Sequence, residues 1–225
     1  MALYLLNNHE HFWQALGAFV VVIIPGLLIG LTIHEFGHAL VAHLQGDAMA
    51  KNMGRVSLNP VRHLDPAGTV MMLLVGFGWG KPVPVNPNAL SGGARRGMAT
   101  VAAAGPLANI ALGILLAIPF KLGHLIWFPA LNWDILTLDA TAFLSILLSF
   151  AILINMTLAV FNLIPIPPLD GFKVLQGFLP RQMAMDIGRL EPYGIGILMV
   201  ILVLGAGPFG DAIYEAATTM ARAVT

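Results

Sequence analysis

The motif HEFGH, at residues 34–38, carries the clearest chemistry in this sequence. On a helix, His34 and His38 lie one turn apart and face the same way, so their imidazoles can bind one metal ion. Glu35 lies beside the pair, where its carboxylate can take a proton from a metal-bound water. The motif lies within an apolar stretch, where ionisable side chains are costly and usually functional. It therefore predicts a zinc site with Glu35 as the general base.

A catalytic zinc ion needs a third protein ligand and keeps a fourth position open. The chain has no cysteine, so this ligand must come from His, Asp, Glu or a carbonyl group. Asp170 is the first candidate, because it ends a proline-rich segment, FNLIPIPPLDG at 161–171, that cannot form a regular helix. Irregular backbone at membrane depth is tolerated only inside protein or beside a wet cavity. Glu191, in a later polar loop, is the alternative ligand.

Composition places this chemistry in a lipid bilayer. Of the 225 residues, 58% are hydrophobic and only 10% are charged, whereas a soluble domain has about 25% charged residues. So little polar surface cannot coat a soluble particle, which indicates an integral membrane protein. The formal net charge is zero and the basic residues are scattered, which argues against a nucleic-acid partner. We expect one integral-membrane domain over residues 1–225.

Apolar stretches show which elements position the motifs, because a membrane-spanning helix needs about 20 apolar residues. The first three candidates lie at 14–44, 98–119 and 141–164, and a shorter fourth lies at 193–210. The segment 67–80 is too short to cross, and its glycines and β-branched residues favour a re-entrant or β-hairpin segment near 67–85. The predicted fold is all-α, with a core of three transmembrane helices and one further C-terminal span. The catalytic core covers about residues 14–180.

The distribution of Lys and Arg predicts how the chain crosses the membrane, because cytoplasmic loops carry an excess of both. Most basic residues lie between spans one and two or between spans three and four, whereas Lys121 and Arg222 lie on the other side. The N-terminus is therefore predicted outside, with the active site toward the cytoplasm. This assignment requires that 67–80 does not cross; otherwise the residues from Lys81 to Arg96 would change sides.

HEFGHA, together with a distal N-x-x-P-x-x-P-x-L-D-G pattern, resembles the site-2 protease family of intramembrane metalloproteases. The middle segments LNPVRHLDPAGT, GWGKPVPVNP and AAAGPLAN resemble its compact bacterial branch, and no PDZ or nucleotide-sensing module is visible. The resemblance implies one zinc ion between the first and third helices of a multi-pass protein of the inner cell membrane. It also implies hydrolysis of peptide bonds within or near transmembrane segments of membrane-protein substrates.

Four further residues are candidates for substrate binding. Asn162 matches the family asparagine that holds the substrate or stabilises the oxyanion, although it could instead cap the third span. Asn109 is a weaker candidate for the same role, with an interhelical hydrogen bond as the alternative. Gly76 and Gly78 mark a possible edge strand that could pair with an unwound substrate.

Two other functions remain open at this point. In the first, a membrane metallopeptidase uses Glu191 as its third ligand and cuts substrate tails near the surface. In the second, a zinc-binding scaffold or metal transporter binds the ion without turnover. The identity of the substrate and the oligomeric state are not determined by the sequence.

Overall fold

The computed structural model describes residues 16–75, 79–128 and 139–225, and these residues form helices and no β-strand. The chain is thus an all-α protein, as predicted. The longer helices are α3 (Ile24–Leu44), preceded by a π-helical turn (Phe19–Ile23), α6 (Ala94–Leu116), α8 (Ala140–Asn162), α11 (Gly194–Leu204) and α12 (Ala206–Val224). The shorter ones are α4 (Met49–Asn52), α5 (Pro66–Val75), α7 (Ile118–Lys121), α9 (Asp170–Phe178) and α10 (Arg181–Gly188).

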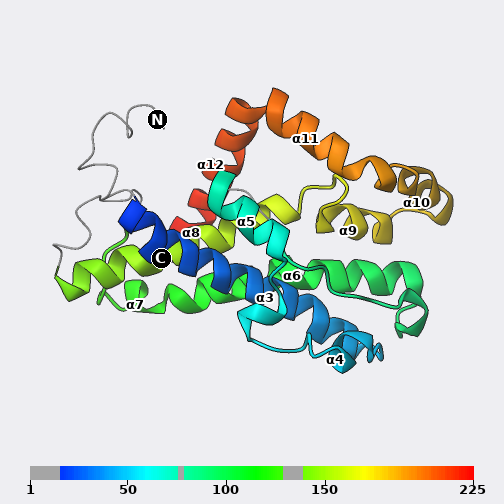
Figure 1. Cartoon of the computed structure of the whole chain (residues 1–225), viewed down its shortest axis with the longest axis horizontal. Coiled ribbons are helices and arrows are strands. Elements are labelled where there is room, and N and C mark those ends of the chain that lie inside the picture. The colour runs from blue at the N-terminus through cyan, green and yellow to red at the C-terminus, as the bar shows by residue number, and fades with distance from the viewer. Residues whose placement is uncertain (1–15, 76–78, 129–138) are drawn as a thin grey trace.

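Helices α3, α6 and α8 pack against one another and form the core of the molecule (Figure 1). Small residues let these helices approach closely, as is usual between membrane helices. A β-carbon on Gly37 of α3 would lie 2.7 Å from the Ala104 carbonyl oxygen of α6. A β-carbon on Gly30 would lie 2.8 Å from Leu158 Cδ1 of α8. The predicted core of three helices is confirmed.

Four segments are long and apolar enough to cross a membrane: Leu16–Leu44, Ala94–Lys121, Ala140–Asn162 and Arg181–Leu204. The first three match the predicted spans to within about four residues, the usual uncertainty of a predicted boundary. The fourth begins earlier than predicted and ends at Leu204. These segments make the chain a multi-pass membrane protein.

The predicted span 193–210 is interrupted at Gly205, between α11 and α12. A β-carbon on this glycine would lie 2.7 Å from the Ile201 carbonyl oxygen, so only glycine fits the bend. Helix α11 has 11 residues and is therefore about 16 Å long, shorter than a bilayer core of about 30 Å. The chain continues in α12, which packs Ala217 and Ala221 against Ile152 and Met156 of α8.

The first part of the segment near 67–85 forms helix α5 (Pro66–Val75), where a β-hairpin was one of two expected structures. Helix α5 starts after Asp65, whose Oδ1 accepts a hydrogen bond from the Gly68 N–H, and Pro66 is its first residue. Both features favour a helix start. The only pairing around it, among the described residues, is one antiparallel bridge between Leu64 and Gly80. This bridge brings both ends of the segment together, and a re-entrant segment stays a prediction.

Candidate metal centre

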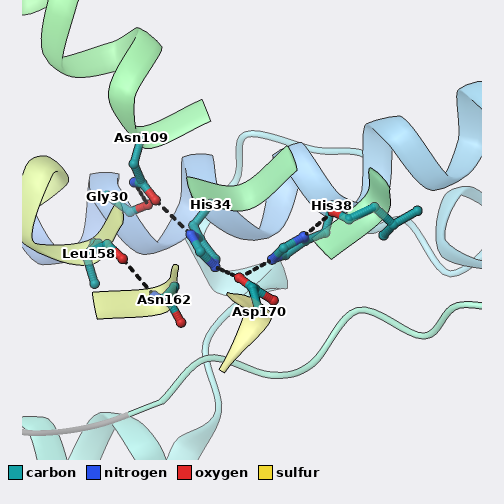
Figure 2. Close-up of polar contacts among 8 residues, drawn as sticks. Gly30, His34, His38, Asn109, Leu158, Asn162 and Asp170 are labelled. Carbon is teal, nitrogen blue, oxygen red and sulfur yellow. Dashed lines mark hydrogen bonds and ion pairs between the residues drawn. The ribbon is translucent and has the colours of Figure 1, made fainter. Parts of the chain in front are cut away.

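Three side chains from two distant parts of the sequence converge between α3 and the start of α9. His34 and His38 lie on α3, and Asp170 is the first residue of α9 (Figure 2). Asp170 Oδ2 lies 3.0 Å from His34 Nε2 and 3.2 Å from His38 Nε2. One ligand atom from each residue lies within 4.8 Å of the others, close enough for all three to reach one metal ion.

The orientation of His34 is fixed by a chain of amide hydrogen bonds. Asn109, which is 0% exposed, donates from Nδ2 to the Gly30 carbonyl (2.9 Å) and to Asn155 Oδ1 (2.8 Å). Both of its N–H groups are therefore used, so the atom facing His34 Nδ1 at 2.7 Å must be the amide oxygen. Consequently His34 Nδ1 carries the proton and donates it to Asn109. The lone pair of His34 is then on Nε2, the atom that faces Asp170.

His38 is oriented in the same way by a backbone acceptor. Its Nδ1 lies 2.8 Å from the Val101 carbonyl oxygen of α6, which can only accept a hydrogen bond. His38 Nε2 therefore also presents a lone pair to Asp170. Metal-binding histidines commonly donate their second ring N–H to an amide or carbonyl oxygen in this manner.

The donor set fits a divalent cation. Two nitrogen lone pairs face an anionic oxygen, which is repulsive unless a positive charge lies among them. Asp170 Oδ2 is buried and, within the described part of the chain, has no hydrogen-bond donor in good geometry. Two imidazoles and one carboxylate are a ligand set typical of catalytic zinc. The residues present could hold such an ion.

Protons can take the place of a cation at the two Nε2 atoms. Burial alone raises the pKa of Asp170. When both Nε2 atoms carry protons, the contacts and positive charges of His34 and His38 lower it instead, to about 2, so Asp170 is a carboxylate in that state. Because metal ligands must be deprotonated, protons and a metal ion compete for this site.

Two glycines bring the backbone close to the centre. A β-carbon on Gly105 of α6 would lie 2.4 Å from His38 Nε2 and 2.8 Å from His34 Cε1, so the backbone of α6 covers both rings. A β-carbon on Gly171 would lie 2.1 Å from the Leu163 carbonyl oxygen. The proline-rich turn, with a cis bond between Pro167 and Pro168, therefore folds back against the end of α8. This fold returns Asp170 to the level of the histidines.

The predicted general base, Glu35, lies at the edge of this cluster. It is half-buried, and its carboxylate acts electrostatically on His38 and on Arg55. A β-carbon on Gly80 would lie 3.2 Å from Glu35 Oε1. Glu35 thus lies between the histidines and the chain that follows α5.

The remaining predicted residues divide into three groups. Asn162 ends α8, and its amide donates to the Leu158 carbonyl at 2.9 Å (Figure 2). Glu191 pairs with Lys173 at 2.6 Å and accepts a hydrogen bond from Gln176, so it is not part of the His–His–Asp cluster. Gly76 and Gly78 lie outside the described residues.

Asn109 makes the interhelical hydrogen bonds that were the alternative to a contact with substrate. Its amide is fully engaged inside the protein, so the alternative of an interhelical hydrogen bond describes it. The sequence also did not identify Gly105, Asn155 or the Val101 carbonyl as supports of the centre. The signals in the sequence are the small residues of AAAGPLAN and the polar Asn155 within an apolar span.

Comparison with known proteins agrees with this geometry. A family model for peptidase family M50 matches residues 121–205, which include Asp170. A Bacillus subtilis protein provisionally named zinc metalloprotease YwhC is 37% identical over 183 residues, 81% of this chain and 80% of the relative. Proteins provisionally named zinc metalloprotease Rip2 are 31% identical over 198 residues in Mycolicibacterium smegmatis and 32% over 195 in Mycobacterium tuberculosis. They cover 84% and 83% of this chain and 69% and 68% of their own lengths. No solved structure matches.

Proposed function

The chain belongs to peptidase family M50, the site-2 protease family, and from this membership we propose that it is a zinc-dependent intramembrane endopeptidase. In this proposal His34, His38 and Asp170 hold one zinc ion and Glu35 is the general base. Its substrates are membrane proteins, cut within or near a transmembrane segment. The observation that carries the proposal is the convergence of Asp170 Oδ2 on both histidine Nε2 atoms, across more than 130 residues of sequence.

The chemistry follows from the positions of these residues. When bound, zinc supplies a Lewis acid that polarises the scissile carbonyl and makes water a nucleophile near neutral pH. Glu35 accepts the proton of the attacking water and returns it to the leaving amine. Asn109 and the Val101 carbonyl hold the two imidazoles so that their Nε2 atoms face inward. Asn162, at the end of α8, remains our candidate for contact with the substrate.

The depth of the site supports cleavage inside the bilayer. His38 lies six residues and His34 ten residues before Leu44, the last residue of α3. At about 1.5 Å per residue these positions lie about 9 and 15 Å from the end of that helix. Both distances are within the thickness of a bilayer core of about 30 Å. A helical substrate would have to unwind there, because its carbonyl groups are engaged in internal hydrogen bonds.

Metal content tests the proposed ligand set. We expect one zinc ion per chain in the purified protein, measured by mass spectrometry of the metal, and loss of that ion in Asp170→Ala. Glu35→Gln should keep zinc, because Glu35 is the base and not a ligand. Glu191→Ala serves as the matched control carboxylate and should also keep zinc. Zinc that survives in Asp170→Ala and is lost in Glu191→Ala would refute the assignment.

Cleavage is tested separately from metal binding. The unmodified protein and Glu35→Gln would be reconstituted with solubilised membrane proteins, and new N-termini would be mapped by mass spectrometry. We expect termini within or beside transmembrane segments that are present with the unmodified protein and absent with Glu35→Gln. Equal sets of termini, with zinc bound in both proteins, would indicate a zinc-binding scaffold or transporter.

A further inference from the structure

A small basic pocket lies next to the segment that contacts Glu35. It has a volume of about 300 Å³ and is lined by three cations, Arg55, Arg62 and Lys81. The other described lining residues are apolar, among them Leu64 and Pro82. No acidic side chain is found among the described residues that line it, so the lining of the pocket is net positive.

Arg55 is the buried cation of this pocket. It is 4% exposed, and its guanidinium donates to the carbonyl oxygens of Arg62, Lys81 and Pro82. Its Nε–H has no acceptor among the described residues. Burial lowers the pKa of Arg55, whereas Glu35 acts in the opposite direction. Glu35 therefore offsets part of the Arg55 charge, whereas no ion pair of Arg62 or Lys81 is found among the described residues, so the three cations together favour binding of an anion.

The acidic residues of the same loop are engaged elsewhere. Asp47 accepts hydrogen bonds from the backbone N–H groups of Met49 and Asn86. Asp65 accepts one from Gly68 at the start of α5. Within the described residues, neither carboxylate lies within ion-pair distance of the three pocket cations. Apart from the electrostatic effect of Glu35 on Arg55, an anion for this pocket would come from another molecule.

The pocket is adjacent to the proposed catalytic base. A β-carbon on Gly80 would lie 3.2 Å from Glu35 Oε1, and the next residue, Lys81, lines the pocket. The Lys81 N–H donates to the His63 carbonyl at 2.7 Å, and Gly80 pairs with Leu64, which fixes this stretch in place. Glu35 in turn acts electrostatically on Arg55, one of the pocket cations. A peptide held for cleavage would thus have residues a few positions from the scissile bond beside the three cations.

We propose that the basic pocket binds an acidic side chain, Asp or Glu, of the substrate a few residues from the scissile bond, and so selects substrates by charge. This proposal rests on the proposed protease function. Arg62 and Lys81 are exposed and can fold around the carboxylate, whereas Arg55 supplies a fixed charge at the wall. A phosphate group of an anionic lipid shares the same chemistry and is the alternative occupant.

Termini mapping in liposomes of neutral phosphatidylcholine tests this selectivity. We expect the cut sites of the unmodified protein to be enriched in Asp and Glu at one fixed position. In Lys81→Glu and Arg62→Glu the enrichment should shift toward Lys and Arg at that position. Arg96→Glu, an exposed reversal on α6 outside the pocket, is the matched control and should leave the preference unchanged. Arg55 is not substituted, because its guanidinium also donates hydrogen bonds to three backbone carbonyl oxygens.

One mapped substrate then gives a quantitative test. Changing its acidic residue to Lys should lower kcat/KM about tenfold with the unmodified protease, and Lys81→Glu should restore most of this loss, as for a charge-assisted contact. Cuts that show no acidic preference, or no shift on charge reversal, would overturn the pocket proposal alone. Cleavage that depends on added phosphatidylglycerol and not on the substrate residue would assign the pocket to lipid. Absence of any Glu35-dependent cut would overturn the protease function itself.

Discussion

Gly105 is the residue of α6 that lies against the imidazole rings of His34 and His38. Its position on α6 lets the helix backbone lie directly over both imidazoles. A methyl group there would overlap His38 Nε2, and His38 cannot move without breaking its hydrogen bond to Val101. The metal centre therefore requires glycine at position 105, because a larger side chain would overlap the imidazole of His38.

We predict that Gly105→Ala lowers zinc affinity at least about tenfold, a loss comparable to that of removing a group that orients a ligand. Competition with a chelating dye measures this affinity. Gly196→Ala on α11 is the matched control, because a β-carbon there meets no atom within 4 Å. Similar affinities in both variants would show that α6 can move away from His38 at little cost.

The amide of Asn109 gives a second prediction at this scale. Asn109→Leu removes the acceptor for the His34 Nδ1–H and leaves the Asn155 oxygen without its donor. We expect zinc affinity to fall about 10- to 100-fold, as is usual when an outer partner of a metal-binding histidine is lost. Asn109→Asp keeps an acceptor for His34 and should lose less. An unchanged affinity in Asn109→Leu would mean that packing alone orients His34.

The metal ligands could be predicted from the sequence, but the residues that orient these ligands through hydrogen bonds could not. His34 and His38 share a helix face through local geometry alone, and the proline-rich turn marks Asp170. The partners of Asn109 depend on which helices are neighbours and on their register, which spacing along one chain does not reveal. The same limit applies to Arg55, whose partners lie on two other loop segments.

At the scale of elements, helix α12 extends the membrane bundle and was not foreseen as a packing element. Its Ala217 and Ala221 are both 0% exposed and lie in a cluster with Ile152, Met156 and Phe120. The apolar pattern of 193–210 predicted one crossing, because hydropathy averages over a bend such as that at Gly205.

The short helix α5 was not predicted from hydropathy either. Its start depends on a local hydrogen bond, from the Gly68 N–H to Asp65 Oδ1.

We predict that Ala217→Leu lowers the melting temperature of the protein in detergent. Overpacking of a tight contact typically costs about 1–3 kcal/mol. The zinc content should be unchanged, because Ala217 belongs to a separate apolar cluster that contains none of the three ligands. Ala216→Leu, at an exposed neighbouring position, is the control and should melt like the unmodified protein. An equal effect of both substitutions would argue against packing of α12 on α8.

At the scale of the whole molecule, the basic residues are distributed unequally between the two ends of the three core helices. The end where α3 and α8 finish and α6 begins carries Arg95 and Arg96 and adjoins the loop with Lys51. The opposite end carries Lys121 on α7, and Arg222 lies near the end of α12. Because Leu64 pairs with Gly80, we predict that the basic residues after α5 lie on the same side of the membrane as those before it. This asymmetry supports a cytoplasmic position for the end nearer the zinc site.

The absence of cysteine makes this orientation directly measurable. Lys51→Cys, Arg96→Cys and Lys121→Cys would each be expressed in bacterial cells and treated with a maleimide that cannot cross membranes. We expect Lys121→Cys to react in intact cells, and the other two to react only after the inner membrane is permeabilised, because basic loops are retained in the cytoplasm. Reaction of Arg96→Cys but not Lys51→Cys in intact cells would mean that the segment around α5 crosses the bilayer. The reverse pattern in all three variants would place the zinc site nearer the outer face.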